Sequence, residues 1–242
     1  MFYWTKDECW VLPLTLAIII AITITLYFTL RKKSDKIRAI PLQVIAVIIL
    51  ILEVFKQSIS IRDGYSFWTI PLHYCSLFLF FIPLAQLTRE RTRNFIKPVA
   101  FSAASAMTLL FYVNPSSIIG SSASDMFISF SKFHTFTFHH LVILYLLLSI
   151  VLRNYTPKWK HFISVLIVMT IYFAIGMTAA HLLDTNYCNF LTSNIPFMES
   201  LRLKTGQVFY SIAMFFFITG GTALLNFIYF LIYKLFTRKK KA

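Results

Sequence analysis

Residues 10–30, WVLPLTLAIIIAITITLYFTL, decide the fold class because they form an apolar run without a single charged side chain. A helix of about 20 such residues crosses the hydrocarbon core of a bilayer. Lys6, Asp7 and Glu8 precede the run, in place of the basic segment that begins a secretory signal peptide. We therefore interpret the run as a first membrane-spanning helix.

The composition of the 242-residue chain agrees with a membrane protein. Hydrophobic residues make up 58% of the sequence, charged residues 13%, and the mean hydropathy is +0.72. The presence of only 6 glycines argues against a glycine-rich phosphate-binding fold. The three cysteines, Cys9, Cys75 and Cys188, lack zinc-site spacing. We predict no metal site and no cofactor.

Six further apolar runs predict an all-α, polytopic membrane protein. The seven expected spanning helices cover residues 10–30, 40–58, 68–87, 97–113, 136–153, 161–182 and 207–233. We expect them to form a single seven-helix domain over residues 1–242.

Basic residues alternate between the segments that connect these runs. Seventeen of the 23 Lys and Arg residues lie in 31–38, 88–97, 153–160 and the tail after residue 233. Cytoplasmic loops are enriched in Lys and Arg, so we expect an extracytoplasmic N-terminus and a cytoplasmic C-terminus. This distribution accounts for the net charge of +14, and we predict no nucleic-acid partner.

Polar residues from four expected helices converge at the outer side of the membrane. Ionisable groups inside spans are costly, and each one is a functional hypothesis. The candidate residues are Glu53, Lys56, His73, Cys75, His139, His140, His181, Asp184, Asn186 and Tyr187. We expect no comparable set at the cytoplasmic side, apart from loop charges.

Several of these candidates also have a purely structural interpretation. Glu53 and Lys56 lie three residues apart and can form an ion pair without a catalytic role. Cys75 can be an inert buried thiol, or a nucleophile if a histidine activates it. His181 and Asp184 can be a base with its orienting carboxylate, or an interfacial pair without chemistry.

The other histidines differ in their expected exposure. His139 and His140 point about 100° apart on a helix, so at most one is expected to face Cys75. His134 and His161 lie beside loops, and we expect them to be solvated.

Three sequence blocks resemble the YwaF-like family of bacterial integral membrane proteins. IPLHYC (70–75) resembles a Pro-Leu-His-x-Cys signature, FHH (138–140) a later histidine block, and DTNYCNFL (184–191) an Asn-Tyr-x-x-Leu block. Their order and spacing extend the resemblance over roughly residues 40–235. The resemblance implies a multi-pass protein of a bacterial plasma membrane.

That family is similar to eukaryotic Cys/His acyltransferases that remodel ether phospholipids. The resemblance implies that Cys75 is the acyl-accepting nucleophile and that His140 or His139 is its base, with His134 less favoured. The implied reaction moves a fatty acyl chain between bilayer phospholipids, which are donor and acceptor, at the extracytoplasmic face.

Candidate donors to the oxyanion of such a reaction are His73, Lys56 and Asn186. Asn186 and Tyr187 match the third block, and the resemblance assigns neither a definite role.

Two functions of other classes stay open. A small-solute or ion transporter or channel also places ionisable groups inside spans, although here they gather at one face. A non-enzymatic lipid-binding protein would make Cys75 dispensable. A retinal-binding receptor is disfavoured because residues 207–233 contain no lysine. The sequence does not determine the oligomeric state.

Overall fold

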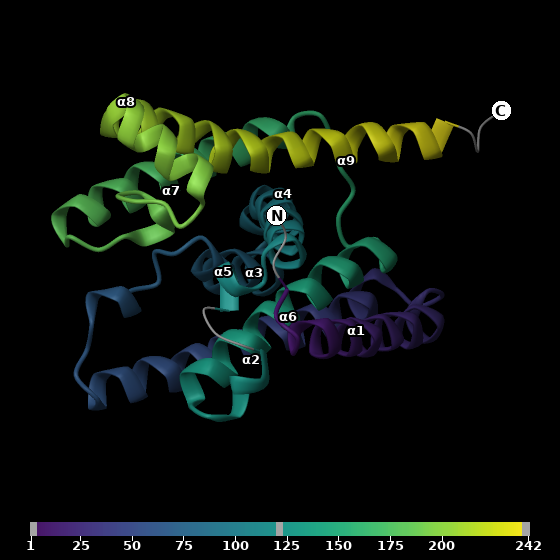
Figure 1. The fold of residues 1–242 in the computed structure, drawn as a ribbon. Helices are drawn as coiled ribbons and strands as arrows, with labels where there is room; N and C mark the ends of the chain where they lie inside the picture. Colours follow the sequence, from purple (N-terminus) through teal and green to yellow (C-terminus); the bar gives the residue numbers. More distant parts are fainter. Residues whose placement is uncertain (1–3, 120–122, 239–242) are drawn as a thin grey trace.

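A computed structural model describes residues 4–119 and 123–238, which form a helical bundle (Figure 1). The helices are α1 (Glu8–Leu30), α2 (Asp35–Arg62), α3 (Phe78–Leu87), α4 (Glu90–Val113), α5 (Ser116–Ile119), α6 (Phe130–Val151), α7 (His161–Leu182), α8 (Pro196–Phe215) and α9 (Gly221–Arg238). Short 3₁₀ turns are η1 (Phe67–Thr69), η2 (Cys75–Leu77), η3 (Ala123–Phe127) and η4 (Tyr187–Asn189), and η5 (Phe216–Gly220) is a π-helical turn. The described residues contain no β-strand, so the all-α prediction is confirmed.

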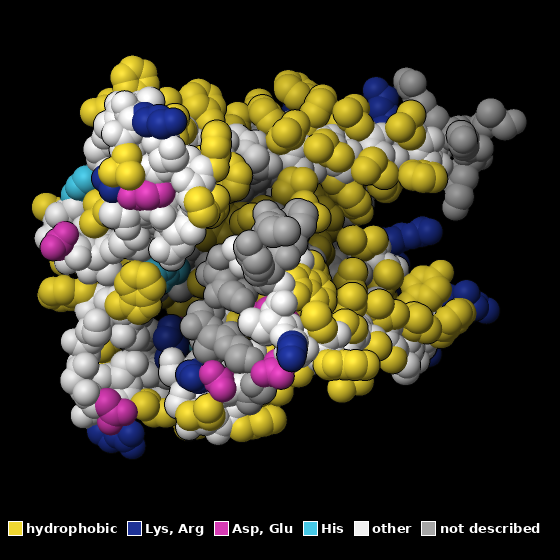
Figure 2. All heavy atoms as spheres, viewed as in Figure 1, with side chains coloured by type: hydrophobic (Ala, Val, Ile, Leu, Met, Phe, Trp, Pro, Cys, Tyr) yellow, Lys and Arg dark blue, Asp and Glu magenta, His cyan; other side chains and the backbone are white. Residues whose placement is uncertain are grey.

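Six helical segments of the described chain are long and apolar enough to cross a bilayer. They are α1, α2, α4, α6, α7 and the stretch Pro196–Thr237 formed by α8 and α9. On α1, Leu14, Ile18 and Phe28 are all more than half exposed, and apolar side chains cover α1 and α9 in Figure 2. Such extended apolar surfaces mark contact with lipid or a partner. The chain is a multi-pass membrane protein.

The third expected spanning helix, 68–87, is shorter than predicted. The apolar helix here covers only Cys75–Leu87, and η1 and an irregular turn precede it. Pro71 has no N–H for a helical hydrogen bond, and Ile70 before it has ψ of 131°, the extended conformation expected before proline. The described residues therefore give six long apolar helices and one short one, in place of seven full-length spans.

The last expected span, 207–233, lies inside a longer helical stretch. Its α8 part is interrupted at Gly206, whose φ of 83° favours glycine, and η5 connects it to α9. The three lysines of the basic tail, 239–241, lie outside the described residues.

The central helix of the bundle is α4. It packs against α3, α6, α7 and α9, and in Figure 1 it lies between a lower group (α1, α2 and α6) and an upper group (α7, α8 and α9). The buried Ala100, Ala103 and Ala104 of α4 allow neighbouring backbones to approach closely, as small residues do in membrane helix packing.

The connecting segments separate toward two ends of the bundle. The turn 31–34, the connection 152–160 and the end of α9 lie toward the right of Figure 1, and 63–74 and 183–195 lie toward the left. Three of the basic segments that the sequence assigns to one side of the membrane therefore lie toward one end of the molecule.

Gly176 of α7 allows a close approach by the 183–195 segment. A Cβ atom at this position would lie 2.8 Å from Cε2 of Phe190, whose side chain is fully buried. We expect Gly176→Ala to lower the free energy of unfolding by roughly 1 kcal/mol, because overpacking costs about 1–3 kcal/mol and the gain in helix propensity returns about 1 kcal/mol at most. Thermal unfolding in detergent measures this change.

Gly221→Ala is the matched control. A Cβ atom there meets nothing within 4 Å, and φ of −60° is helical, so we expect equal or higher stability. Equal unfolding midpoints for the two variants would contradict the packing argument.

Candidate functional site

The irregular segment before Cys75 is held by other parts of the chain. Tyr172 of α7 donates a hydrogen bond to the Leu72 carbonyl at 3.0 Å. The Tyr74 amide donates to Cys188 Sγ at 2.7 Å. These contacts fix the position where η2 begins, and therefore the position of Cys75.

Cys188 is a structural thiol by its contacts. It lies outside the spanning helices, and burial raises its pKa to about 12. Its sulfur lies 2.7 Å from the Tyr172 hydroxyl and 3.6 Å from the Leu72 carbonyl. The thiol therefore connects the 183–195 segment to the irregular segment that precedes Cys75.

Cys75 itself is half-buried at the start of η2. The ammonium group of Lys56 lies within electrostatic range of Cys75, His73 and His139. Across the described residues, the Nε2 atoms of His73 and His139 have no hydrogen-bond partner, so neither is bonded to the thiol in this conformation. Cys75, His73 and His139, from the first two sequence blocks, thus lie around the Lys56 ammonium group. The Cys75 thiol is not hydrogen-bonded to the Nε2 atom of either histidine.

Glu53 of α2 is the centre of a buried polar cluster and is 6% exposed. Its carboxylate accepts hydrogen bonds from Gln57 Nε2 at 2.6 Å and from Lys56 Nζ at 3.2 Å. His134 Nε2 of α6 lies 3.2 Å from Glu53 Oε2, at ion-pair distance. Gln57 also donates to the Thr69 carbonyl at 3.1 Å. The cluster joins α2, α6 and η1, and it contains the Glu53–Lys56 pair that the spacing suggested.

The expectation that His134 is solvated is wrong. The residue is 4% exposed, because α6 begins at Phe130 and carries His134 into the bundle. His161 is half-buried and lies 2.9 Å from the Tyr155 hydroxyl.

His139 and His140 differ in whether their Nε2 atom has a hydrogen-bond partner. Their Nδ1 atoms lie 2.6 Å and 2.7 Å from the carbonyls of Thr135 and Phe136. A carbonyl only accepts, so Nδ1 carries the proton in both rings and Nε2 is the basic nitrogen. His140 Nε2 lies 3.0 Å from the Thr15 hydroxyl, whereas His139 Nε2 is buried and unpartnered among the described residues. His139 therefore has the free basic nitrogen.

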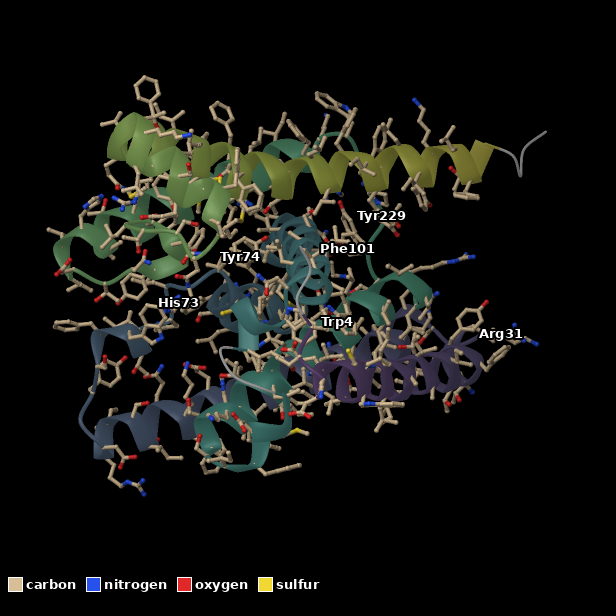
Figure 3. The ribbon with its side chains drawn as sticks, in the orientation of Figure 1. Trp4, Arg31, His73, Tyr74, Phe101 and Tyr229 are labelled. Atoms are coloured by element: carbon tan, nitrogen blue, oxygen red, sulfur yellow. The ribbon has the colours of Figure 1, made fainter. Side chains whose placement is uncertain are left out.

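His73 is enclosed by aromatic rings, toward the end of the bundle opposite Arg31 (Figure 3). Its ring centre lies 4.3 Å from that of Trp68 and 5.2 Å from that of Tyr187. His73 lies before the short apolar helix, and its Nε2 atom is buried without a hydrogen-bond partner among the described residues.

Two residues of the third block support the site without facing the thiol. Asn186 closes its own loop, since Oδ1 accepts from the Leu191 amide at 2.9 Å and Nδ2 donates to Thr192 Oγ1 at 2.8 Å. Tyr187 is fully buried and packs on His73. Asn186 is therefore occupied and is not a free oxyanion donor in this conformation.

His181 and Asp184 lie apart from the buried cluster. Both are exposed, and no ion pair joins them in the part of the chain that the structure describes. The arrangement does not support a base with an orienting carboxylate at these two positions.

A second polar network joins α9, α4 and the connection 152–160, on the side of the molecule where the sequence predicted only loop charges. Asn226 of α9 donates to Ser102 Oγ at 2.9 Å and to the Tyr155 hydroxyl at 2.8 Å. Tyr155 continues the network to His161. The sequence signal was available, because Asn226 is a polar residue within the apolar run 207–233.

Sequence reasoning also missed three residues of the site, Gln57, Tyr172 and Cys188. Gln57 has a usable signal, because it follows Glu53 by four residues on one helix face. Tyr172 has none, because its role depends on a contact with Leu72 across 100 residues of chain.

The helices and the buried cluster define the class: a multi-pass membrane protein with a candidate site at one end of its bundle. A comparison of the sequence with known families then identifies its family. The chain belongs to the TMEM164 family, which it matches over residues 2–233. Curated proteins and solved structures gave no match. The family match includes every candidate residue and does not itself assign an activity.

Glu53 is expected to stabilise the fold through its cluster. Glu53→Leu leaves Lys56 and His134 without their carboxylate, and breaking a buried pair costs about 3–5 kcal/mol. Lys56→Gln should cost less, because the Lys56 side chain is 21% exposed and can reach water. Unfolding by denaturing detergent measures both changes.

Ser58→Leu in the same helix is the matched control, because Ser58 is exposed. If Glu53→Leu is as stable as Ser58→Leu, the cluster contributes nothing to stability and the argument fails.

Proposed function

We propose that this protein is a membrane lipid acyltransferase that moves a fatty acyl chain between bilayer phospholipids through a thioester on Cys75. The observation that supports the proposal is the free, buried Nε2 of His139, which lies, like the Cys75 thiol, within electrostatic range of Lys56. A thiol needs a base or a cation to react as thiolate. His139 and Lys56 are the groups of this site that supply them.

His139 is the preferred base over His140. The Nε2 atom of His140 is engaged with Thr15, so taking up a proton there would disrupt a contact between α1 and α6. The Nδ1 hydrogen bond of His139 to a backbone carbonyl orients the ring and stabilises the imidazolium that forms. Of the two histidines that the sequence left open, we therefore propose His139 as the base.

The reaction requires Cys75 to move within hydrogen-bond reach of His139. Catalytic hydrogen bonds are often long before substrate binds and tighten in the reactive complex. Cys75 lies in a 3₁₀ turn that follows an irregular segment, and the proposal requires a change of this turn that brings the thiol to His139.

The steps conserve atoms and charge. His139 Nε2 takes the thiol proton, Cys75 Sγ attacks an ester carbonyl of the donor phospholipid, and the protonated His139 returns the proton to the departing lyso-phospholipid oxygen. His139 then takes the proton of the acceptor hydroxyl, whose oxygen attacks the thioester. The C–S bond breaks, and the protonated His139 returns its proton to the departing Cys75 sulfur. Lys56 and His73 are the proposed donors to the oxyanion.

The proposed orientation places this site at the extracytoplasmic face of a bacterial plasma membrane. It rests on the separation of the basic connecting segments from His73 toward opposite ends of the bundle (Figure 3) and on the enrichment of Lys and Arg in cytoplasmic loops. In this topology the short helix Cys75–Leu87, with the segment before it, is the third of seven crossings. Donor and acceptor phospholipids then enter from the bilayer.

A proton-coupled transporter is a second candidate, favoured by one observation. The Glu53–His134 pair is buried in the helical bundle, and such pairs also occur in proton relays. A transporter would not need the thiol of Cys75, whereas the acyltransferase would. Loss of Cys75 therefore distinguishes the two functions.

Intact-protein mass spectrometry after incubation with defined diacyl phospholipids tests the acyltransferase. We expect an acyl adduct on the wild-type protein that hydroxylamine removes. Cys75→Ser should lose the hydroxylamine-sensitive adduct, and His139→Ala should slow its formation by about 10²–10⁴-fold, the usual contribution of a general base. His140→Ala should keep most of the rate.

Cys9→Ser is the matched thiol control, because Cys9 is an exposed free cysteine, and it should still form the adduct. Gel filtration checks that each variant is folded. An adduct that persists in Cys75→Ser, or the absence of any adduct and lyso-lipid with every lipid class tested, would reject this function. A loss that is larger in His140→Ala than in His139→Ala would reject the assignment of the base.

A further inference from the structure

A recess lined by four cationic side chains lies at the end of the bundle opposite His73. Its volume is about 330 Å³, and Figure 3 marks this end by Arg31. The lining residues come from the end of α1, the turn after it, the start of α2 and the end of α6: Tyr27, Arg31, Lys32, Arg38, Val151 and Arg153. None of these lining residues is acidic.

Two of the guanidinium groups are held in place by their neighbours. Arg31 lies over the rings of Phe28 and Tyr27, at 5.0 Å and 5.7 Å from their centres, which restrains a long side chain. The Arg38 side chain is 21% exposed and pairs with Asp35. Arg38 Nε is buried and has no hydrogen-bond partner within the described chain. The recess therefore contains positioned cationic groups, not only a mobile basic loop.

Arg153 occupies a backbone position that normally favours glycine. Its φ is 54°, and α6 ends there with hydrogen bonds from the Asn154 amide to the Ser149 carbonyl and from the Arg153 amide to the Ile150 carbonyl. This pattern is the Schellman motif, in which glycine is the usual residue at this position. An arginine at the strained position directs a cation toward the recess in place of a residue that would fit without strain.

The cations and the surrounding surface together define the ligand. Arg38 is already paired with Asp35, whereas Arg31, Lys32 and Arg153 have no acidic partner in the described part of the chain. These positive charges repel each other, and an anion between them reduces that repulsion. The same end of α1 exposes Ile24 and Phe28, which are 50% and 61% exposed, so an apolar surface runs from the recess along the helix. A free phosphate ion would pair only with the cationic groups of the recess. An anionic phospholipid would pair with these groups and also contact the apolar surface of α1.

We propose that this recess binds the phosphate-bearing headgroup of an anionic phospholipid from the leaflet on that side, with the acyl chains lying along α1. Guanidinium groups bind phosphate oxygens in pairs, and basic pockets between membrane helices bind lipid headgroups. The site is separate from Cys75, and the proposal does not depend on the acyltransferase.

Native mass spectrometry of the purified full chain, titrated in detergent with phosphatidylglycerol or phosphatidylcholine, tests this site. We expect wild type to retain phosphatidylglycerol in preference to phosphatidylcholine. The triple variant Arg31→Gln, Arg38→Gln, Arg153→Gln should weaken that retention by about 10²-fold, since each surface charge contributes roughly fivefold. Inorganic phosphate at millimolar concentration should not displace the lipid.

Arg89→Gln, Arg91→Gln, Lys160→Gln is the matched control, because it removes three exposed positive charges that do not line the recess. It should retain phosphatidylglycerol as wild type does. Equal loss in the control and the triple variant would show general charge attraction and overturn the proposal. Displacement of the lipid by inorganic phosphate would identify a free-anion site and would also overturn it.

Arg153→Gly keeps the test decisive if the triple variant does not fold. Glycine relieves the positive φ, so this variant should unfold at the same or a higher temperature than wild type while retaining phosphatidylglycerol about fivefold more weakly. Unchanged lipid retention in a stable Arg153→Gly would overturn the proposal.

Discussion

The structure around the candidate site depends on satisfying the backbone polar groups of residues 67–74. An unsatisfied carbonyl or amide in hydrocarbon costs several kcal/mol, and the short turn η1 satisfies only some of these groups within the segment. The side chains of Tyr187, Gln57 and Tyr172 donate to three of its carbonyls, those of Phe67, Thr69 and Leu72. Side chains from three elements, η4, α2 and α7, therefore hold this one irregular segment by hydrogen bonds.

These hydrogen bonds to residues 67–74 explain why a chain made of apolar helices brings its polar residues together. Gln57 serves both the Glu53 carboxylate and η1, so the ion cluster and the irregular segment share a residue. Tyr187 packs on His73 while its hydroxyl bonds to the Phe67 carbonyl. A change at any of these contacts reaches Cys75 through the backbone of the segment.

The sequence predicted the long helices because hydropathy depends on composition over about 20 residues and needs no tertiary information. It failed at 68–87, where Pro71 and hydrogen bonds from distant side chains replace the first turns of the helix. The three-residue spacing of Glu53 and Lys56 allowed the ion pair that the structure contains. Sequence reasoning gave no partner for His134, because α6 begins at Phe130, before the expected span of 136–153, and this earlier start decides the burial of His134.

The distinction between His139 and His140 shows a further limit of sequence reasoning. Their angular separation on the helix was known, but the free nitrogen is decided by Thr15 of α1, 125 residues away. Likewise, the Schellman position of Arg153 depends on where α6 ends, and nothing in the local sequence marks an arginine for that conformation. Chemistry at the level of single atoms requires the folded neighbours.

The shortness of α3 has a consequence for the surrounding bilayer. Its ten residues rise about 15 Å, against a hydrocarbon thickness of about 30 Å. The neighbouring Phe67 and Trp68 are 55% and 57% exposed, and aromatic residues of this kind settle at the headgroup level. Hydrophobic mismatch of this sign thins the adjoining membrane. In the proposed topology, where α3 lies within the third crossing, such thinning would bring the glycerol-ester layer of one leaflet toward the depth of Cys75.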